Sequence, residues 1–329
     1  MRNVTDEDAQ FFAHLQHIIP YHLTLLRDEA RNKLFCRALE EVVTGDTRVL
    51  DIGSGSGVWA IMAAKLGAKS VTAIEGDSAL IPVSRSHARE NGVADKIEII
   101  HGNSLEVKPR HKFDVVISES IVNQAFVEGI IATMLDARKR FLARGGIIIP
   151  ETVSLMSAPA HLADEETTPL GVPIVADYIR NLALNVHFKT SDKSKLRLLA
   201  EPVALLDADL RKISSEPAYN GLTGKWQLED ISRVNAVVLW ARSRLIDAID
   251  LDTWDTTNWS PVVCKVEPFP AGRGELEFEL NLNSKQYHWT VRVTSSTNGA
   301  TRSYTPMFAY AKLKFDAARE PVKQATSKS

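Results

Sequence analysis

The stretch Val49-Leu50-Asp51-Ile52-Gly53-Ser54-Gly55-Ser56-Gly57 decides the fold. Its apolar first half predicts a strand, and its three alternating glycines predict a tight turn that leads into a helix. Glycine at these positions lets the backbone come close to a ligand, because a Cβ would clash there. A second predicted strand, residues 70–75, ends at Glu75, whose carboxylate can bind a ribose. The turn and the carboxylate together predict a nucleoside-bearing cofactor in a doubly wound α/β domain.

The spacing of the glycines narrows the choice of cofactor. A dinucleotide fingerprint reads G-x-G-x-x-G, whereas this turn reads G-x-G-x-G with Asp51 two residues ahead of it. A carboxylate so close to the turn would repel a pyrophosphate, but it suits the cationic, phosphate-free S-adenosylmethionine. The turn therefore resembles that of class I S-adenosylmethionine-dependent methyltransferases. An NAD-dependent dehydrogenase is the weaker alternative, and a plain strand-to-helix turn without a ligand is the simplest one.

The composition indicates a globular protein of ordinary surface chemistry. The 329 residues suffice for two domains, and 44% are hydrophobic, 24% are charged and the net charge is -2. This balance gives no general attraction to nucleic acid or to an anionic membrane. Cys36 and Cys264 are too few for a disulfide framework, and the acidic N-terminus does not read as a signal peptide, so we expect a cytoplasmic protein. No run of apolar residues is long enough to span a bilayer, and no histidine spacing predicts a metal site.

Strand and helix patterns alternate through the first half of the chain, which predicts a parallel sheet. We expect N-terminal helices that cap the cofactor site over residues 1–44 and a Rossmann-like domain over residues 45–150, closed by Pro150. The predicted elements are a helix over residues 23–43, strands over 47–52, 70–75, 96–101, 113–118 and 147–149, and helices over 59–66, 80–91 and 130–142.

The second half, residues 151–315, is richer in strand patterns. Apolar and polar residues alternate over 275–282 and again over 288–293, which predicts an antiparallel hairpin with one buried face. Apolar residues within about 160–190 follow helical spacing instead, so we expect a helical insertion there, either an interaction arm or a segment that packs on its own domain. The polar tail, residues 316–329, is predicted to be disordered.

Two glutamates suggest what the domain does with its cofactor. Glu119 follows the predicted strand 113–118 at the edge where open α/β sheets bind ligands, and Glu128 comes nine residues later. Two like charges resist being brought together, so a planar cation between them is a physical reason for the pair. A guanidinium, with five N–H donors in a fixed fork, suits two carboxylates.

With these residues the chain resembles the protein arginine methyltransferases over most of its length. Glu119 and Glu128 match the two glutamates of that family's "double-E" loop, and His22-Leu23-Thr24-Leu25-Leu26-Arg27-Asp28-Glu29-Ala30-Arg31 is similar to its pattern H-x-x-M-L-x-D-x-x-R. Thr257-Asn258-Trp259 stands where the family has a Thr-His-Trp loop, and Gly145–Pro150 resembles its link between domains. The resemblance implies a methyltransferase domain, an antiparallel β-barrel and a helical arm inserted in the barrel that makes a homodimer.

The resemblance also implies roles for individual residues. Arg31 would pair with the carboxylate of S-adenosylmethionine, and the two glutamates would hold the guanidine. The implied site consists of Glu119 and Glu128 as catalytic residues, Arg31, Asp51, Gly53, Gly55, Glu75 and Ser104 as cofactor-binding residues, and Asp28, Asn258 and Trp259 as substrate-binding residues.

Several positions depart from the family pattern, mostly on the substrate side. Ser120 replaces the Trp that follows the first glutamate, and Asn258 replaces the histidine that pairs with the aspartate matching Asp28. Leu105 stands where the family has the acid that holds the adenine amino group. We therefore expect free L-arginine or a small arginine derivative, as in bacterial relatives of the streptozotocin pathway, slightly ahead of protein arginine. Methylation of another small acceptor, or a silent dimeric binding relative, are the alternatives.

Overall fold

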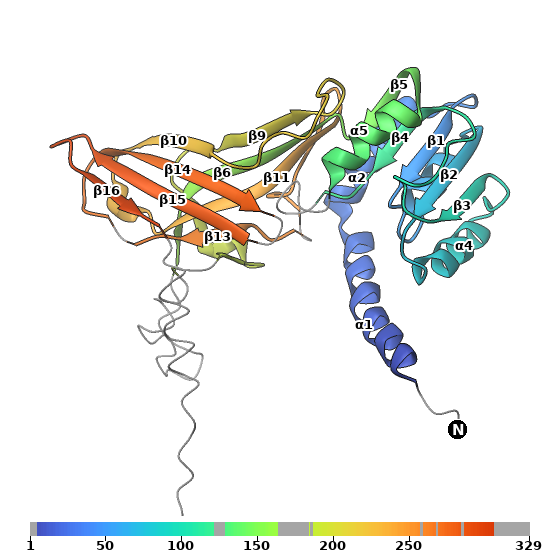
Figure 1. Ribbon diagram of the computed structural model, residues 1–329, viewed down its shortest axis with the longest axis horizontal. Helices are drawn as coiled ribbons and strands as arrows, with labels where there is room; N and C mark the ends of the chain where they lie inside the picture. The colour runs from blue at the N-terminus through green and yellow to red at the C-terminus, as the bar shows by residue number, and fades with distance from the viewer. Residues whose placement is uncertain are drawn as a thin grey trace, which may run out of the picture. The chain divides into compact units, whose positions relative to one another are not determined.

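The computed structural model describes residues 5–121, 129–163, 184, 187–256, 259–267, 269–283 and 286–305. The chain divides into two compact units (Figure 1). The first unit comprises Met1–Met156, Ala204–Ala218 and Trp240–Pro261, and the second comprises Ser157–Val203, Tyr219–Leu239 and Val262–Ser329.

The first unit contains a five-stranded sheet with helices α1 to α5, as the alternating pattern predicts. The order β3-β2-β1-β4-β5 is parallel throughout, so β1 has β2 on one side and β4 on the other. At such a switch in strand order the carboxyl ends of neighbouring strands open toward a ligand. The helices are α1 (Asp6–Arg27), α2 (Glu29–Val42), α3 (Val58–Lys65), α4 (Leu80–Glu90) and α5 (Ile130–Arg140), and the strands are β1 (Arg48–Ile52), β2 (Ser70–Glu75), β3 (Ile97–His101), β4 (Phe113–Ser118) and β5 (Leu142–Ile149).

The N-terminal segment corrects one prediction. The apolar i, i+4 pattern predicts a single helix over residues 23–43, whereas the structure breaks the helix at Asp28. The Asp28 carboxylate accepts a hydrogen bond from the Arg31 amide at 3.1 Å and so caps the first turn of α2. The helical periodicity continues across the break and therefore hides it.

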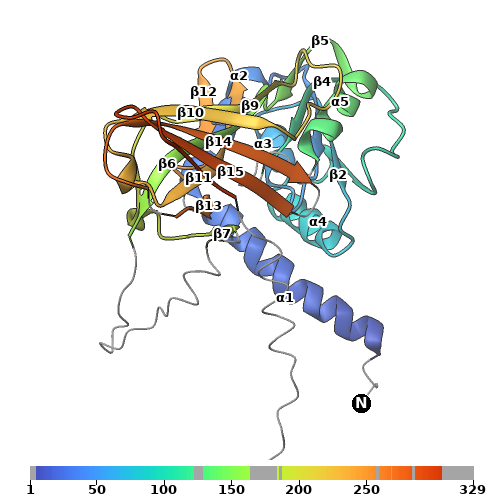
Figure 2. The ribbon, with the colours of Figure 1, turned by 60° about the vertical axis from the view of Figure 1, so that its left-hand side comes forward.

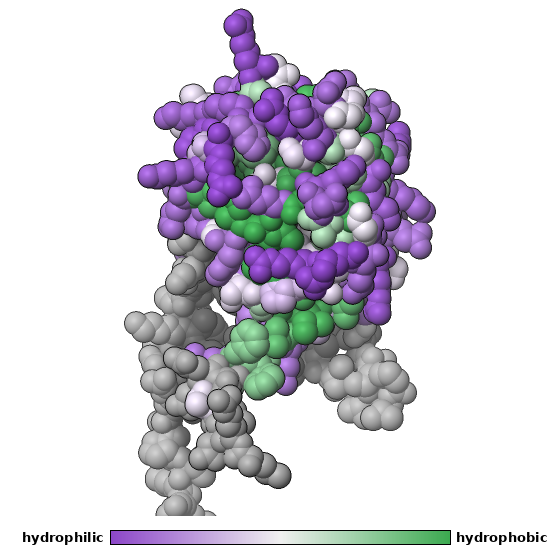
Figure 3. Space-filling model, turned by 90° about the vertical axis from the view of Figure 1, so that its right-hand side faces the viewer, coloured by the Kyte–Doolittle hydropathy of each residue, from purple (hydrophilic) through white to green (hydrophobic). Residues whose placement is uncertain are grey.

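Helix α1 keeps part of its apolar surface in solvent. Phe11 is 47% and Phe12 is 56% exposed, and Ile19 is also exposed. Figure 3 views the right-hand side of Figure 1 and shows hydrophobic side chains gathered in the middle and lower part of this face, framed by hydrophilic ones. Helix α2, in contrast, buries Phe35 completely, and this ring stacks on Trp59 of α3 with centroids 4.7 Å apart.

The second unit confirms the predicted antiparallel hairpin. Strands β14 (Gly274–Asn283) and β15 (Gln286–Ser295) pair in register, so that Leu276, Phe278 and Leu280 are fully buried. Figure 2 shows β10 (Leu222–Leu228) beside β14 in the same sheet. The four-stranded sheet has the order β10-β14-β15-β16, and a seven-stranded sheet has β7-β13-β11-β6-β8 with β9 paired to β6 and β12 paired to β11.

The remaining elements are the two long strands β6 and β11, several short strands and two single 3-10 turns. Strands β6 and β11 contain residues of both units. Their bounds are β6 (Thr152–Leu162), β7 (His187–Lys189), η1 (Lys193–Lys195), β8 (Leu196–Leu198), β9 (Val203–Asp209), η2 (Ile231–Arg233), β11 (Ala236–Ile246), β12 (Ile249–Asp252), β13 (Val262–Lys265) and β16 (Thr301–Tyr304).

Some predictions fall outside the described residues. Most of the predicted helical insertion, residues 160–190, lies outside the described residues. At its two ends, residues 160–162 and 187–189 are strands rather than helix. The tail over residues 316–329 lies outside the described residues as well. No helix in the described part of the chain is long and apolar enough to cross a membrane.

Candidate active site

The glycine turn is fastened to the end of β2 by its own backbone. Gly53 and Ser54 both donate to the Ile74 carbonyl, at 2.9 and 3.1 Å, and the Gly55 amide donates to Glu75 Oε2 at 2.6 Å. Gly53, Gly55 and Gly57 have φ values of +69°, +55° and +85°, a backbone region that L side chains rarely adopt. The predicted turn therefore forms at the carboxyl ends of β1 and β2.

The Glu75 carboxylate is held by two backbone amides. Its second oxygen, Oε1, accepts the Asp77 amide at 2.7 Å. Glu75 is buried, yet it lines the cavity described below, and each carboxylate oxygen has a further lone pair for a ligand hydroxyl. This placement suits the ribose-binding role expected from the sequence.

Asp51 is buried below the turn rather than at the cavity surface. Its Oδ2 accepts the Ala60 amide at 3.0 Å and so holds the first turn of α3, while Oδ1 has no hydrogen-bond partner among the described residues. Burial, together with the nearby charges of Glu75 and Glu119, raises the pKa of this carboxyl to about 7. Asp51 thus shapes the turn and adds an ionisable group behind it.

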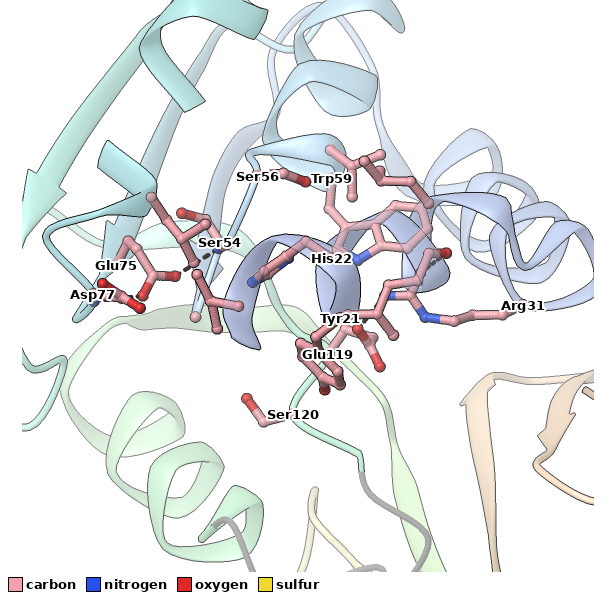
Figure 4. A pocket seen from close by; sticks show the side chains of 17 residues that line it. Tyr21, His22, Arg31, Ser54, Ser56, Trp59, Glu75, Asp77, Glu119 and Ser120 are labelled. Carbon is pink, nitrogen blue, oxygen red and sulfur yellow. Dashed lines mark hydrogen bonds and ion pairs between the residues drawn. The ribbon is translucent and has the colours of Figure 1, made fainter. Parts of the chain in front are cut away.

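A cavity of about 190 Å³ opens above the glycine turn (Figure 4). Helix α1 forms one wall of it, and Figure 4 shows His22 between Glu75 on one side and Arg31 on the other. A Cβ added to Gly55 would lie 2.6 Å from Cε1 of His22, so only glycine fits beneath this ring. The lining residues are Ile18, Tyr21, His22, Leu25, Leu26, Arg31, Gly53, Ser54, Gly55, Ser56, Val58, Trp59, Glu75, Asp77, Leu80, Glu119 and Ser120.

His22 and Trp59 are two of the cavity residues that the sequence analysis did not select as ligands. His22 belongs to the ten-residue match, which was the available signal, and burial lowers its pKa. Helix α1 is held beside the turn by an ion pair at the rim, in which His14 Nε2 lies 2.6 Å from Asp77 Oδ2. No sequence spacing connects residues so far apart in the chain.

Arg31 and Glu119 meet at the other end of the cavity. Their side chains are 2% and 7% exposed and form an ion pair through Nη2 of Arg31. Nη1 donates to the Leu25 carbonyl at 3.1 Å and to Asn32 Oδ1 at 2.7 Å, while Nε has no partner among the described residues. A buried carboxylate therefore already holds a guanidinium in this cavity.

Aromatic rings surround the Arg31 guanidinium. Its Cζ lies 5.1 Å from the ring centroid of Trp59, 5.8 Å from that of Phe35 and 5.9 Å from that of Trp259. Such rings attract a cation by their quadrupoles. Trp259 is thus buried next to Arg31, while Asn258 and Glu128 lie outside the described residues. Asp28 does not line the cavity, because its carboxylate caps α2.

Ser104 lies in a second cavity of about 230 Å³ that shares Gly53 and Ser120 with the first. Its walls include Gly76 at the end of β2 and Asn103 in the loop after β3. Small-molecule sites usually measure roughly 300–1,000 Å³, so the two adjoining cavities together are the size of one such site. Five of the expected cofactor-binding residues thus lie along one trough, namely Arg31, Gly53, Gly55, Glu75 and Ser104, while Asp51 lines neither cavity.

Ser120 lies where the two cavities adjoin. Its hydroxyl lies 3.3 Å from that of Ser118, and a Cβ on Gly53 would approach it to 3.2 Å. The small side chain leaves open the space that a Trp at this position would fill. Among the described residues, no group of three or more His, Cys, Asp or Glu side chains could hold a metal ion.

Comparisons with known proteins agree with this geometry. The family model of the ribosomal protein L11 methyltransferase matches residues 32–153, which contain the parallel sheet. The structure of Arabidopsis thaliana protein arginine methyltransferase 10 in an open conformation superposes with a TM-score of 0.73 and 18% identity, covering 88% of this chain and 99% of that one. The Trypanosoma brucei PRMT1 enzyme–prozyme heterotetrameric complex with AdoHcy gives 0.69 and 19%, covering 87% and 98%. The fold is that of the class I methyltransferases.

The relatives in sequence are named arginine N-methyltransferases. The chain is 30% identical over 226 residues to the arginine N(omega)-methyltransferase of Streptomyces achromogenes subsp. streptozoticus, covering 65% of this chain and 62% of that protein. It is 27% identical over 215 residues to a probable protein arginine N-methyltransferase 6 of Arabidopsis thaliana, covering 64% of this chain and 46% of that protein. The match thus spans about half the length of this plant relative. The chain is a relative of the arginine N-methyltransferases.

Proposed function

We propose that this chain is an S-adenosylmethionine-dependent N-methyltransferase that acts on the guanidino group of arginine. The observation that carries the proposal is Glu119, a buried carboxylate at the end of β4 that already pairs with a guanidinium beside the glycine turn. Cofactor and acceptor would then lie in one trough. The arginine methyltransferase relatives support the same acceptor chemistry.

The residues present fit the expected cofactor. The glycine turn carries no side chains that would fill the cavity above it, and Glu75 offers oxygens to ribose hydroxyls. Arg31 lines the same cavity, and its guanidinium is a charged donor that suits a carboxylate ligand. When bound, S-adenosylmethionine would supply the methyl group of its sulfonium, and a guanidino nitrogen would attack that methyl carbon in line as the S–C bond breaks and the neutral thioether leaves.

Glu119 would contribute by electrostatics and positioning. A free guanidinium is protonated and delocalised and is therefore a poor nucleophile. A carboxylate on one side draws positive charge toward the distant nitrogens and leaves the attacking nitrogen richer in electron density. The N–H proton leaves as the new N–C bond forms and passes to a carboxylate, for which we propose Glu128. This residue lies outside the described residues, so its role rests on the sequence.

Free L-arginine or a small arginine derivative is the acceptor that we favour slightly over protein arginine. Ser120 leaves room in the trough where the family pattern has a Trp, and Asn258 replaces the histidine of the family's loop. Both departures are on the substrate side. The Streptomyces relative is an arginine N(omega)-methyltransferase, which supports arginine as the acceptor.

The test is a mass-spectrometric assay with S-adenosylmethionine that compares free L-arginine with an Arg-Gly-rich peptide. We expect methylated free arginine. Methylation of the peptide alone would mean that the acceptor is protein arginine rather than free arginine. If S-adenosylmethionine binds and neither acceptor is methylated, the guanidine chemistry is wrong, and another acceptor or a silent binding relative takes its place.

We further propose a cytoplasmic homodimer. The T. brucei relative is a heterotetrameric complex, which supports association of chains with this fold. Light scattering coupled to gel filtration measures the mass directly against the 36.4 kDa of one chain. A single peak at the mass of one chain at micromolar concentration would overturn the dimer.

A further inference from the structure

The first part of the link between β3 and β4, residues 102–107, contributes to the second cavity and is called the 102–107 loop below. Gly102, Asn103 and Ser104 line it, while Leu105 points away with 49% of its surface exposed. The loop contains no helix or strand, so its shape depends on the contacts that hold it. At its start, the Gly102 amide donates to the Glu75 carbonyl at 2.8 Å, which ties the loop to the residue expected to bind ribose.

Helix α5 holds the other end of the loop through a single side chain. Arg140 Nη1 donates to the Val107 carbonyl at 2.6 Å, and Nη2 donates to the Ser104 carbonyl at 2.7 Å. Two backbone carbonyls three residues apart are therefore fixed by one planar guanidinium. A lysine could not reproduce this contact, because its ammonium is a point charge without the fork.

The guanidinium is itself held in place. Arg140 Nε donates to Asp136 Oδ1 at 2.6 Å, and Nη2 bonds to the other Asp136 oxygen, so the pair is bidentate across one helical turn. The Cζ of Arg140 lies 4.6 Å from the ring centroid of Phe141, which is buried. Both ionised side chains are about three-quarters buried. A carboxylate, a guanidinium and a ring thus form one rigid support.

We propose that Asp136 and Arg140 are a positioning pair that sets how tightly the 102–107 loop holds the cofactor, because Arg140 fixes the Ser104 and Val107 carbonyls. This inference rests on the proposed function. The pair touches neither cavity, because neither residue lines it, and it acts through the carbonyl of Ser104. Displacement of Ser104 and Asn103 would change the wall that faces the ligand without touching the glycine turn, Arg31 or Glu119.

The chain offers a matched control two residues away on the same helix. Arg138 also donates to two backbone carbonyls, those of Leu210 and Ile213, through its two Nη atoms. These acceptors belong to the segment after β9 and line neither cavity. Removal of Arg138 therefore costs comparable contacts but leaves the cofactor loop supported.

The experiment compares Arg140→Gln and Asp136→Asn with Arg138→Gln in the full chain. Calorimetric titration with S-adenosylmethionine gives the cofactor Kd, the initial rates give the KM for the acceptor at saturating cofactor, and the melting temperature reports folding. We expect Arg140→Gln to raise the cofactor Kd on the order of tenfold, which corresponds to the loss of hydrogen bonds from a charged group, and to leave the acceptor KM within twofold. Asp136→Asn should have a smaller effect.

The outcomes separate this inference from the function on which it rests. Arg138→Gln should lower the melting temperature about as much as Arg140→Gln without changing the cofactor Kd. The double variant of Asp136 and Arg140 should bind no worse than Arg140→Gln alone, because both act through one contact. An unchanged cofactor Kd in Arg140→Gln, or an equal rise in Arg138→Gln, would overturn the positioning role. A wild-type chain that binds no S-adenosylmethionine would overturn the proposed function instead.

Discussion

Replacement of Glu119 by glutamine removes one negative charge from the trough and keeps the size of the side chain. The carboxylate pairs with Arg31, and the two side chains are 7% and 2% exposed, so that water and salt screen the pair little. The substitution therefore tests two consequences of one contact. These are the stability of the ligand-free fold and the rate of methyl transfer.

The structure sets the size of the stability loss. A hydrogen bond to a charged group contributes about 1.5–3 kcal/mol and a neutral one about 0.5–1.5 kcal/mol, so Glu119→Gln should cost about 1–2 kcal/mol. The bonds from Arg31 Nη1 to the Leu25 carbonyl and Asn32 Oδ1 remain and limit the loss. Glu119→Ala leaves the buried guanidinium without this partner and should cost about 3–5 kcal/mol.

The rate should fall much further than the stability. Loss of a preorganised charge at the reacting group costs on the order of 100-fold or more in rate, and glutamine cannot supply that charge. Both Glu119→Gln and Glu119→Ala should therefore be nearly inactive, although their stabilities differ. This separation distinguishes a catalytic carboxylate from one that only supports the fold.

Urea unfolding of the ligand-free protein and the mass-spectrometric assay with L-arginine measure the two effects. Glu29→Gln is the control, because Glu29 pairs with Lys33 at 3.1 Å while its side chain is 83% exposed, and such surface pairs contribute little. A Glu119→Gln variant that retains more than about a tenth of the wild-type rate would refute the charge argument. Stability unchanged from wild type would refute the buried ion pair.

Three further substitutions follow from the geometry of the first cavity. Gly55→Ala should raise the cofactor Kd at least tenfold and lower stability by about 1–3 kcal/mol, because φ is +55° and the new Cβ meets an imidazole at 2.6 Å. Gly92→Ala is the control, because Gly92 has a φ of +69° but open space around it. Its backbone strain should lower the stability measured by calorimetry without changing the cofactor Kd. Since burial raises the pKa of Asp51 from 3.8 to about 7, the folded state keeps a proton that the unfolded chain loses in this window. Wild-type stability should therefore fall relative to Asp51→Asn as pH rises from 3.8 to about 7 and then level off, and parallel pH curves in urea unfolding would contradict the shift. His14→Ala breaks an ion pair that is partly exposed, so we expect at most about 1 kcal/mol and a rise of a few-fold in the cofactor Kd, and an unchanged Kd would show that α1 needs no such contact.

The sequence predicted the parallel half of the fold well. Alternating glycines after an apolar strand and a carboxylate at the end of the next strand are local signals, so their spacing sufficed to predict the turn between Ile52 and Val58. The hairpin of β14 and β15 could be predicted equally well, because the apolar residues Leu276, Phe278 and Leu280 alternate with polar ones and form one buried face.

Capping and long-range contacts were harder to predict. The apolar period runs through Asp28, so only the cap to the Arg31 amide reveals the helix break. The pairs His14–Asp77 and Arg31–Glu119 join residues 63 and 88 positions apart, and no local pattern encodes them. The resemblance to a family pointed to Arg31 and Glu119, but it gave no role to His14.

The roles of individual site residues remain predictions that the geometry now sharpens. The resemblance implies that Trp259 binds the substrate. It is buried, yet its ring lies 5.9 Å from the Arg31 guanidinium, so it can influence the site by holding a cation that itself faces the cavity. Asp28 supports Arg31 through the backbone, because its carboxylate accepts the Arg31 amide and caps α2.

Helix α1 forms one wall of the cavity, so changes in this helix can affect the rate at which product leaves. A ligand beneath His22 is enclosed on that side by a helix whose outer residues, such as Phe11 and Phe12, remain in solvent. Where a wall of this kind must move before product leaves, release rather than methyl transfer sets the pace. Substitutions along residues 11–19, remote from Glu119, should then alter the lifetime of bound product and leave the chemical step unchanged.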